Sequence, residues 1–428
     1  MKIYRNPGKK ELKKILARPV KDHEQIEKIV KPILEKVRRG GDHALRKFAL
    51  EYDHVSLDDI WVSTEELDAA KNQVDDKLKD SIAVAMENIH RFHEAQKQED
   101  LEMEVMEGVF CSRKSVAIEN VGLYVPGGTA PLFSTVLMLG IPAKIAGCKQ
   151  IILASPTDRI GQLSPEILYA ANAIGIHKIL KIGGAQAIAG LAYGTESVPK
   201  VDKIFGPGNQ YVTAAKQLAA KDAVAIDMPA GPSEVMVVID KEANPDFAAA
   251  DLLSQAEHGV DSQVILVTSD EEIARKTQLA VSEQLKTLPR KQIAQESLSN
   301  SAIIVLEKEE GIINAINDYG PEHLIINTTN AESLSESVRN AGSVFIGPYT
   351  PESAGDYASG TNHTLPTNGW AKAYSGVSLD SFVKKITYQK ITKKGIESLG
   401  PVVEHMAEAE HLHAHKQAVS LRLASLKQ

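Results

Sequence analysis

The chain has 428 residues and carries 48 Lys and Arg against 56 Asp and Glu, so its formal net charge is −8. A composition of 43% hydrophobic and 24% charged residues is typical of a soluble globular protein and argues against a disordered or fibrous one. The acidic balance argues against a nucleic-acid binder that relies on neutralising phosphates. Cys111 and Cys148 are too few for a disulfide framework, so we expect a reducing compartment.

The beginning of the chain and its longest charge-free stretch predict a cytoplasmic protein. The sequence MKIYRNPGKK lacks the apolar segment of a secretory signal. The stretch from Val121 to Ala143 contains Pro126, Pro131 and Pro142, which a simple membrane-spanning helix would not carry. We therefore expect neither secretion nor a membrane span.

The first hundred residues are charge-dense and predict helices. Apolar residues recur at helical spacing over 26–37, with Asp22 as a possible N-cap and Gly40-Gly41 as a stop. Pro32 lies inside this pattern and should kink or split the helix. Two further helices are predicted over residues 42–52 and 64–98.

After about Ser115, short β-branched runs alternate with helical stretches such as 166–173 and 270–286. Strands are predicted over residues 151–154, 178–182, 203–205, 234–239, 263–268, 302–306, 324–327 and 343–346. Alternation of strands and helices requires crossover connections, which produce parallel sheets covered on both faces. Eight strands are many for one twisted sheet, so we expect two.

The predicted fold class is α/β, with two Rossmann-like parallel-sheet units, a helical N-terminal region and a small helical C-terminal tail. The predicted domains are an arm (1–25), one unit (26–119 plus 234–375), a second unit (120–233) and the tail (376–428). In this division the N-terminal helices pack on the 234–375 unit.

Three glycine-rich turns follow predicted strands: Pro126-Gly127-Gly128, Gly183-Gly184-Ala185-Gln186 and Gly206-Pro207-Gly208-Asn209. Ligands usually bind at the carboxyl edge of a parallel sheet, where helix N-termini offer free N–H groups to phosphates. Each turn alone could be an ordinary strand-to-helix connection. Three within about 85 residues favour a nucleotide cleft, although no turn completes the dinucleotide fingerprint G-x-G-x-x-G.

Metal-ligand candidates are dispersed along the chain. Gln255 and His258 are three residues apart and share a helix face. Asp356 offers a carboxylate in a turn-rich segment, and the tail contributes three histidines: His411, His413 and His415. His411 and His415 share a face, whereas His413 points elsewhere, and a solvated polar face is the alternative interpretation. Two imidazoles, an amide oxygen and a carboxylate suit a borderline ion such as Zn²⁺.

Glu322 and His323 form the best acid–base pair. They stand directly before a predicted strand, and histidine titrates near neutral pH. A surface turn is the alternative interpretation. Ser233 lies in Gly-Pro-Ser-Glu and not in a G-x-S-x-G elbow, so a nucleophilic triad is poorly supported.

Taken together, these motifs resemble the successive blocks of the histidinol dehydrogenase family. The blocks occur in order over about 300 residues and the similarity extends through nearly the whole chain. They are VGLYVPGG (121–128), GGAQAI (183–188), FGPGN (205–209), DMPAGPSE (227–234), SQAEHG (254–259), YGPEHL (319–324), AGDY (354–357) with GTNH (360–363), and Glu410 with His415.

The resemblance implies a zinc-dependent, NAD-linked oxidoreductase that takes L-histidinol through L-histidinaldehyde to L-histidine and reduces two NAD+. It implies one Zn²⁺ per subunit, which we infer anchors and orients the substrate, and a homodimer whose tails complete the partner's active site. The implied zinc ligands are Gln255, His258, Asp356 and His415, and the implied catalytic pair is Glu322 and His323. The implied substrate contacts are Ser233, Gln255, His258, His323, Asp356, Glu410 and His415, with His363 as a further neighbour. The implied NAD contacts are Tyr124, Gln186 and Asn209.

In this interpretation His323 is the base of both oxidations, Glu322 activates water for the second, and the 120–233 unit contacts NAD. Neither cysteine is needed as a nucleophile. Two alternatives stay open at this point. One is another zinc enzyme, such as a hydrolase that uses Glu322 to activate water, and the other is a non-enzymatic nucleotide or metal sensor.

Overall fold

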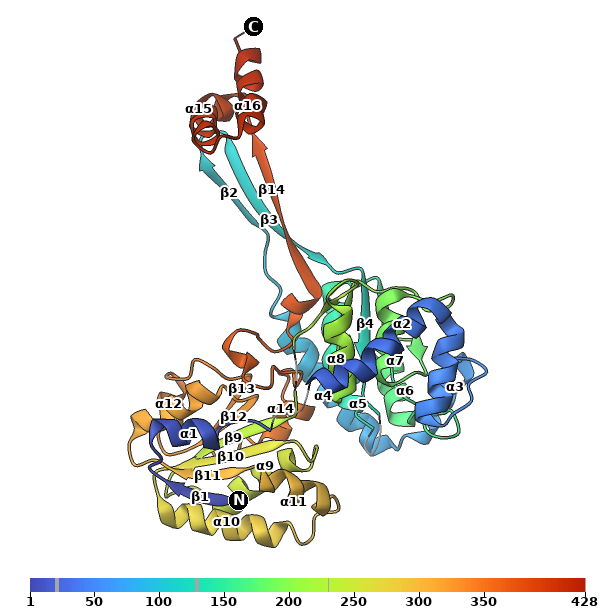
Figure 1. The fold of residues 1–428 in the computed structure, drawn as a ribbon, viewed down its shortest axis with the longest axis vertical. Coiled ribbons are helices and arrows are strands. Elements are labelled where there is room, and N and C mark those ends of the chain that lie inside the picture. Colours follow the sequence, from blue (N-terminus) through green and yellow to red (C-terminus); the bar gives the residue numbers. More distant parts are fainter. Residues whose placement is uncertain (20–22, 128–130, 230, 428) are drawn as a thin grey trace.

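The protein consists of two lobes and a long arm, shown in Figure 1 as a computed structural model. The structure describes residues 1–19, 23–127, 131–229 and 231–427, without the side chain of His23. The predicted N-cap Asp22, Gly128 of the first glycine turn and Ala230 of the 227–234 motif lie outside the described residues.

The first lobe is built on a parallel sheet in the order β6-β5-β4-β7-β8. Its strands are β4 (Asn120–Tyr124), β5 (Gln150–Ala154), β6 (Ile179–Leu180), β7 (Lys203–Phe205) and β8 (Ala225–Ile226). Its crossover helices are α5 (Phe133–Ala146), α6 (Pro165–Ala173), α7 (Gly184–Tyr193) and α8 (Gln210–Ala219). Helix α5 is apolar on all sides and is buried over residues 134–143, as expected of a helix inside the lobe.

The second lobe repeats this order in a parallel sheet, β1-β11-β10-β9-β12-β13. Its strands are β1 (Lys2–Arg5), β9 (Glu234–Ile239), β10 (Gln263–Thr268), β11 (Ala302–Val305), β12 (His323–Asn327) and β13 (Ser343–Ile346). Its helices are α1 (Lys9–Ile15), α9 (Pro245–Ala256), α10 (Glu271–Gln284), α11 (Lys291–Ser299), α12 (Glu309–Tyr319), α13 (Ala331–Ser335) and α14 (Glu352–Tyr357). Two doubly wound parallel sheets confirm the predicted fold class, and β1 is an edge strand that the sequence did not predict.

The N-terminal helices pack on the first lobe, so their predicted packing on the 234–375 unit is wrong. Helix α2 (His23–Phe48) lies against α7 and α8, α3 (Thr64–Gln73) against α6, and α4 (Asp76–Glu94) against α5. The apolar face of α2, with Val30 and Leu45, shares one core with Ile188 of α7. Helical periodicity identifies the face that a helix buries, but it does not identify the sheet that receives it.

The helix boundaries follow local signals. Helix α2 continues through Pro32 and leaves helical geometry at Gly41 (φ 52°), where a stop was predicted. The predicted 64–98 helix is two helices, because Asp75 caps α4 by accepting a hydrogen bond from the N–H of Leu78 at 3.0 Å. Short segments complete the chain: η1 (Ala49–Asp53), η2 (Trp370–Lys372) and η3 (Leu379–Phe382).

The arm is an antiparallel sheet that carries two helices at its far end (Figure 1). Its elements are β2 (Leu101–Met106), β3 (Val109–Ala117), β14 (Val383–Ile391), α15 (Lys393–Ala409) and α16 (His413–Ser425). The predicted helical tail is therefore wrong over 383–391, because those residues pair with β3 in the register Lys385↔Ser115. Among the residues that the structure describes, none of the helices combines the length and apolar character needed to cross a membrane.

Candidate active site and metal centre

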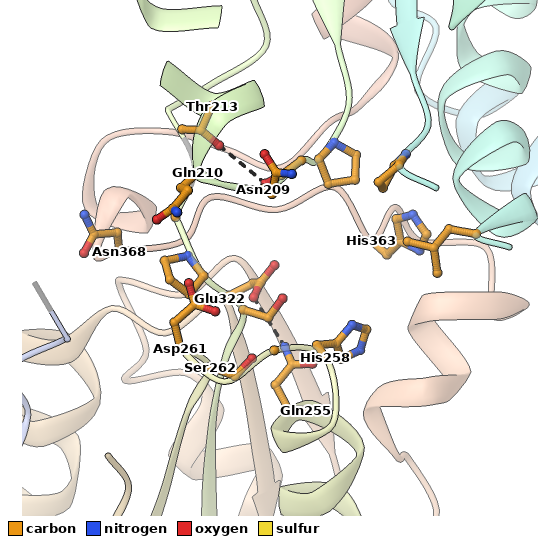
Figure 2. Close-up of a pocket in the computed structure, with 18 of the residues that line it drawn as sticks. Asn209, Gln210, Thr213, Gln255, His258, Asp261, Ser262, Glu322, His363 and Asn368 are labelled. Atoms are coloured by element: carbon orange, nitrogen blue, oxygen red, sulfur yellow. Dashed lines mark hydrogen bonds between the residues drawn. The ribbon is translucent and has the colours of Figure 1, made fainter. Parts of the chain in front are cut away.

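A cavity of about 540 Å³ lies between the two lobes. Figure 2 shows Asn209, Gln210 and Thr213 of the first lobe on one side, facing Gln255, His258 and Glu322 of the second. The lining side chains that the sequence singled out are Ser233, Gln255, His258, Glu322, His323, Asp356 and His363 from the 233–375 part of the chain, and Asn209 from the 120–233 part. Segments far apart in the sequence therefore meet in one cavity.

The first lobe faces the cavity with the carboxyl edge of its sheet. The strand order reverses between β4 and β7, and the loops after these two strands supply Pro126, Pro207 and Gly208 to the cavity wall. Gly206 has φ +124°, and a Cβ atom there would lie 2.0 Å from the carbonyl oxygen of Tyr124. Only glycine allows the two loops to approach this closely.

The three predicted NAD residues lie at the predicted loops, but only one of them lines the cavity in the described part of the chain. Asn209 caps α8, and its Oδ1 accepts hydrogen bonds from the N–H groups of Tyr211 (3.0 Å) and Val212 (3.1 Å). Tyr124 and Gln186 are buried instead. The hydroxyl of Tyr124 accepts from the N–H of Gly184 at 3.0 Å.

The second lobe faces the cavity with the opposite, amino edge of its sheet. Ser233 directly precedes β9, and Glu322 and His323 lie where the neighbouring strand β12 begins. Helix α9 runs back across the sheet from its N-cap Asn244, so its C-terminal end brings Gln255 to the same edge. Partial negative charge at a helix C-terminus favours a cation there.

Gln255 connects the acid–base pair to the rest of the site. Its Nε2 lies 3.0 Å from Nδ1 of His323 and 3.3 Å from Oε2 of Glu322. The backbone N–H of Glu234 also donates to that carboxylate oxygen, at 2.9 Å.

Three buried polar atoms of the cavity residues are left without a hydrogen-bond partner among the described residues: Oε1 of Gln255, Nε2 of His323 and Oε1 of Gln210. Buried polar atoms are normally satisfied, so such atoms at a cavity call for a ligand. His323 Nε2 lies 3.4 Å from Oδ1 of Asp356. The orphaned amide oxygen suits a metal ion, and the free ring nitrogen suits a substrate hydroxyl.

A metal-ligand cluster stands beside these atoms. One potential ligand atom each from His258, Glu352 and Asp356 lies within 4.8 Å of the others. Imidazole, carboxylate and the amide oxygen of Gln255 form a donor set that fits a zinc ion. Sequence reasoning missed Glu352, which is 1% exposed. Its position four residues before Asp356 on α14, and thus on the same helix face, was the available signal.

The acidic groups of the site have strongly perturbed pKa values. Burial raises the pKa of Glu322 to about 8 and that of Glu352 to about 8. For His323, burial lowers the pKa, but the carboxylates of Glu352, Glu322 and Asp356 outweigh it and raise the pKa to about 10. A site that holds protons this strongly stabilises positive charge.

The other two histidines of the site are kept neutral. Desolvation at the cavity wall lowers the pKa of His258 and of His363. The ring of His363 is fixed at both nitrogens, by Oγ1 of Thr135 at 3.0 Å and the carbonyl oxygen of Asp356 at 2.9 Å. Because Thr135 belongs to α5 and Asp356 to α14, His363 joins the two lobes at the cavity.

The structure does not bring Glu410 and His415 to the cavity within one chain. Glu410 follows α15 and His415 lies on α16, at the far end of the arm (Figure 1). Both side chains are exposed. One chain therefore assembles Gln255, His258 and Asp356 but leaves the fourth predicted zinc ligand far away.

The cysteines stand apart from this chemistry. Neither lines the cavity in the described part of the chain. Burial raises the pKa of Cys148 to about 11, so its thiol stays protonated at neutral pH.

Comparisons with known proteins agree on one family. The sequence profile of histidinol dehydrogenase matches residues 16–423. Histidinol dehydrogenase of Bacteroides thetaiotaomicron is 55% identical over 427 residues, which cover 100% of both chains. That of Escherichia coli (strain K12) is 50% identical over 419 residues, covering 97% of this chain and 96% of the relative. The crystal structure of histidinol dehydrogenase from Elizabethkingia anophelis matches with a TM-score of 0.97 and 56% identity, covering 100% of this chain and 99% of that one.

Proposed function

Because the chain belongs to the histidinol dehydrogenase family, and is thus an NAD-dependent oxidoreductase of histidine biosynthesis, we propose that it oxidises L-histidinol through L-histidinaldehyde to L-histidine. Two NAD+ are reduced in this sequence. The observation that carries the proposal is the cavity in which Glu322 and His323 stand beside a metal-ligand cluster. The family assignment does not favour the zinc hydrolase.

The proposed metal is one Zn²⁺ per subunit, held by Gln255, His258 and Asp356 of one chain and His415 of a second. Support comes from the unpartnered Oε1 of Gln255 and from the closeness of His258 and Asp356. When bound, zinc supplies positive charge that holds the imidazole and amine of the substrate and lowers the pKa of nearby acids.

In the first oxidation, His323 takes the proton of the substrate hydroxyl while the carbinol carbon gives its hydride to NAD+. The product is the aldehyde. The buried Nε2 of His323, which has no hydrogen-bond partner among the described residues, is the atom suited to this role. The hydrogen bond from Gln255 to Nδ1 fixes the orientation of the ring.

In the second oxidation, Glu322 takes a proton from a water molecule that adds to the aldehyde, and the protonated His323 returns its proton to the carbonyl oxygen, so that the hydrate forms and His323 is again a base. His323 then accepts the proton of the hydrate hydroxyl as a second hydride leaves for another NAD+, and the carboxylate of histidine results. Glu322 and His323 are both buried, so the aldehyde is held away from bulk water between the steps. Ser233 and His363 line the same cavity and are proposed substrate contacts, together with Glu410 of a second chain.

The proposed NAD site is the carboxyl edge of the first sheet. Asn209 lines the cavity there, while Tyr124 and Gln186 shape the neighbouring glycine loops. The positive ends of the α7 and α8 helix dipoles at this edge suit the anionic pyrophosphate.

We also propose a homodimer in which the arm of each chain reaches the site of the other. Strand β2 is exposed along its whole length, and Leu101, Met103 and Val105 are 49%, 51% and 51% exposed. Apolar residues at alternate positions form one face, which a second chain can cover. A cytoplasmic location is part of the proposal and rests on the composition and the two cysteines.

The test is the absorbance at 340 nm after adding L-histidinol and NAD+ to the purified protein. We expect two NADH per histidinol, loss of activity with a chelator and recovery when zinc is added back. Absence of NADH formation with the zinc-loaded protein would overturn the proposed reaction, and full activity in the chelated, zinc-free protein would overturn the proposed metal.

A further inference from the structure

We propose that the buried ion pair Lys216–Asp227 positions the third glycine loop for NAD, although neither residue lines the cavity. The proposal rests on the proposed function, because it assumes that Asn209 contacts NAD. Lys216 lies on α8 and Asp227 directly follows β8, so the pair ties together two elements that follow the loop 206–209 in the chain.

The ion pair binds both backbone polar groups of Gly206, the N–H and the carbonyl oxygen. Nζ of Lys216 lies 2.5 Å from Oδ1 of Asp227 and donates to the carbonyl oxygen of Gly206 at 2.8 Å. Oδ2 of Asp227 accepts from the N–H of Gly206, also at 2.8 Å. One charged pair thereby satisfies the donor and the acceptor of a single residue.

Burying this pair is costly, so its placement needs a reason. The two side chains are 4% and 1% exposed, and a buried ion pair contributes little net stability compared with apolar residues of similar volume. Such a pair can instead specify one conformation among several. The conformation specified here is that of Gly206, whose φ of +124° is a region that favours glycine.

The position of Gly206 sets the geometry of the loops on both sides. On one side it packs against the carbonyl oxygen of Tyr124, at the end of β4. On the other side the chain reaches the cavity within three residues, at Asn209. A shift of Gly206 would therefore move Asn209, and with it the N-terminal end of α8 that it caps, relative to Tyr124.

Asp227 adds a second consequence, because it begins the segment that leads from the first lobe to Ser233 and β9. Its Oδ1 accepts from the N–H of Met228 at 2.7 Å, which fixes the direction in which this segment leaves the sheet. Lys203 on β7 provides a matched control. It is a partly buried lysine of the same lobe whose charge also acts on Asp227, but it donates to the carbonyl oxygen of Ser381 at 2.9 Å and makes no hydrogen bond to the described part of the loop. Replacing it therefore removes a nearby charge without removing a contact to the loop.

The experiment compares K216M, the charge-balanced K216M/D227N, K203M and N209A as zinc-loaded enzymes. The double variant keeps an acceptor for the N–H of Gly206 and leaves neither member of the pair charged, so it remains informative if K216M fails to fold. Thermal unfolding and zinc content are measured for each variant. The decisive readouts are the Kd of NADH from fluorescence titration and the KM values for NAD+ and histidinol.

We expect K216M/D227N to raise the Kd of NADH and the KM of NAD+ at least tenfold, with the KM of histidinol and the zinc content within twofold of the unaltered protein. K203M should leave both NADH and NAD+ values within twofold, even if it lowers Tm. A double variant that binds NADH normally while N209A binds it weakly would overturn the positioning role alone. If N209A also binds NADH normally, the proposed NAD site falls as well, and the positioning role with it.

Discussion

The two lobes share one strand order but present opposite edges to the cavity. In the first lobe the carboxyl edge faces the cavity, where helices begin and the positive ends of their dipoles suit an anion. In the second lobe the amino edge faces it, where α9 ends and its carbonyl groups suit a cation. The edge that faces the cavity, and not the strand order, therefore decides which ligand charge each lobe suits, which agrees with the proposed dinucleotide on one side and the proposed metal on the other.

The largest effect on activity is expected at the amino edge of the second sheet. Replacing Glu322 with Gln keeps the shape of a side chain that is protonated at neutral pH in the metal-free protein, and its hydrogen bond from Glu234 can persist. We expect a normal Tm but a loss of activity of about a thousandfold, because a general base contributes on the order of 10²–10⁴. Absorbance at 340 nm measures the rate. A loss of less than about tenfold would show that the chemistry lies elsewhere.

Paired substitutions sharpen the contrast between the two edges. Gln255→Ala removes the unpartnered Oε1, so the zinc content should fall while the Kd of NADH changes less than threefold. Asn209→Ala should do the reverse, raising the Kd of NADH about tenfold with the zinc content unchanged, on the scale of one lost polar contact. Metal analysis and fluorescence titration of the same preparations check both. Loss of zinc from N209A, or loss of NADH binding from Q255A, would contradict the assignment of zinc to one sheet edge and of NAD to the other.

A smaller effect concerns how the stability of the metal-free protein depends on pH. Burial raises the pKa of Glu352 from the ordinary value of 4.5 to about 8, so between these values the folded state binds more protons than the unfolded chain. The free energy of unfolding therefore falls as the pH rises through this window. Glu352→Gln removes this contribution, so its Tm should exceed that of the unaltered protein more at pH 8 than at pH 5. A difference in Tm that is independent of pH would contradict the assignment.

The smallest effect on turnover is expected from replacing the two cysteines. Cys111→Ala with Cys148→Ala should leave the turnover number within about threefold, because neither thiol lines the cavity and Cys148 is protonated at neutral pH. A loss of a thousandfold in the 340 nm assay would instead indicate a thiol nucleophile. Some loss of Tm is compatible with the account, since Cys148 belongs to the core of the first lobe.

The sequence predicted the parallel sheets well because their strands are short buried β-branched runs. The bounds of β7, β9, β10 and β13 coincide with the predicted ranges. The arm was missed because β14 pairs with β3 about 270 residues earlier in the chain, and because β2 exposes the apolar residues that normally mark a buried strand. Neither long-range pairing nor an uncovered face can be read from local periodicity.

The candidate site was predictable where the residue types were diagnostic. Gln255, His258, Glu322, His323 and Asp356 belong to the recognised motifs, and the structure brings all of them to one cavity. Glu352 was missed because a lone glutamate on a short helix resembles a surface residue until its burial is known. In the proposed dimer the place of His415 depends on a second chain, which periodicity and spacing cannot reveal.

The central claim is that one complete site needs Gln255, His258 and Asp356 from one chain and His415 from another. Mixing a His415→Ala protein with a Glu322→Gln protein tests it most directly, once mass spectrometry shows that the subunits have exchanged. Each protein alone should be almost inactive, whereas random pairing should restore about a quarter of the sites through hybrid dimers. Activity that stays at the sum of the two separate proteins, in a mixture that contains hybrids, would contradict the claim.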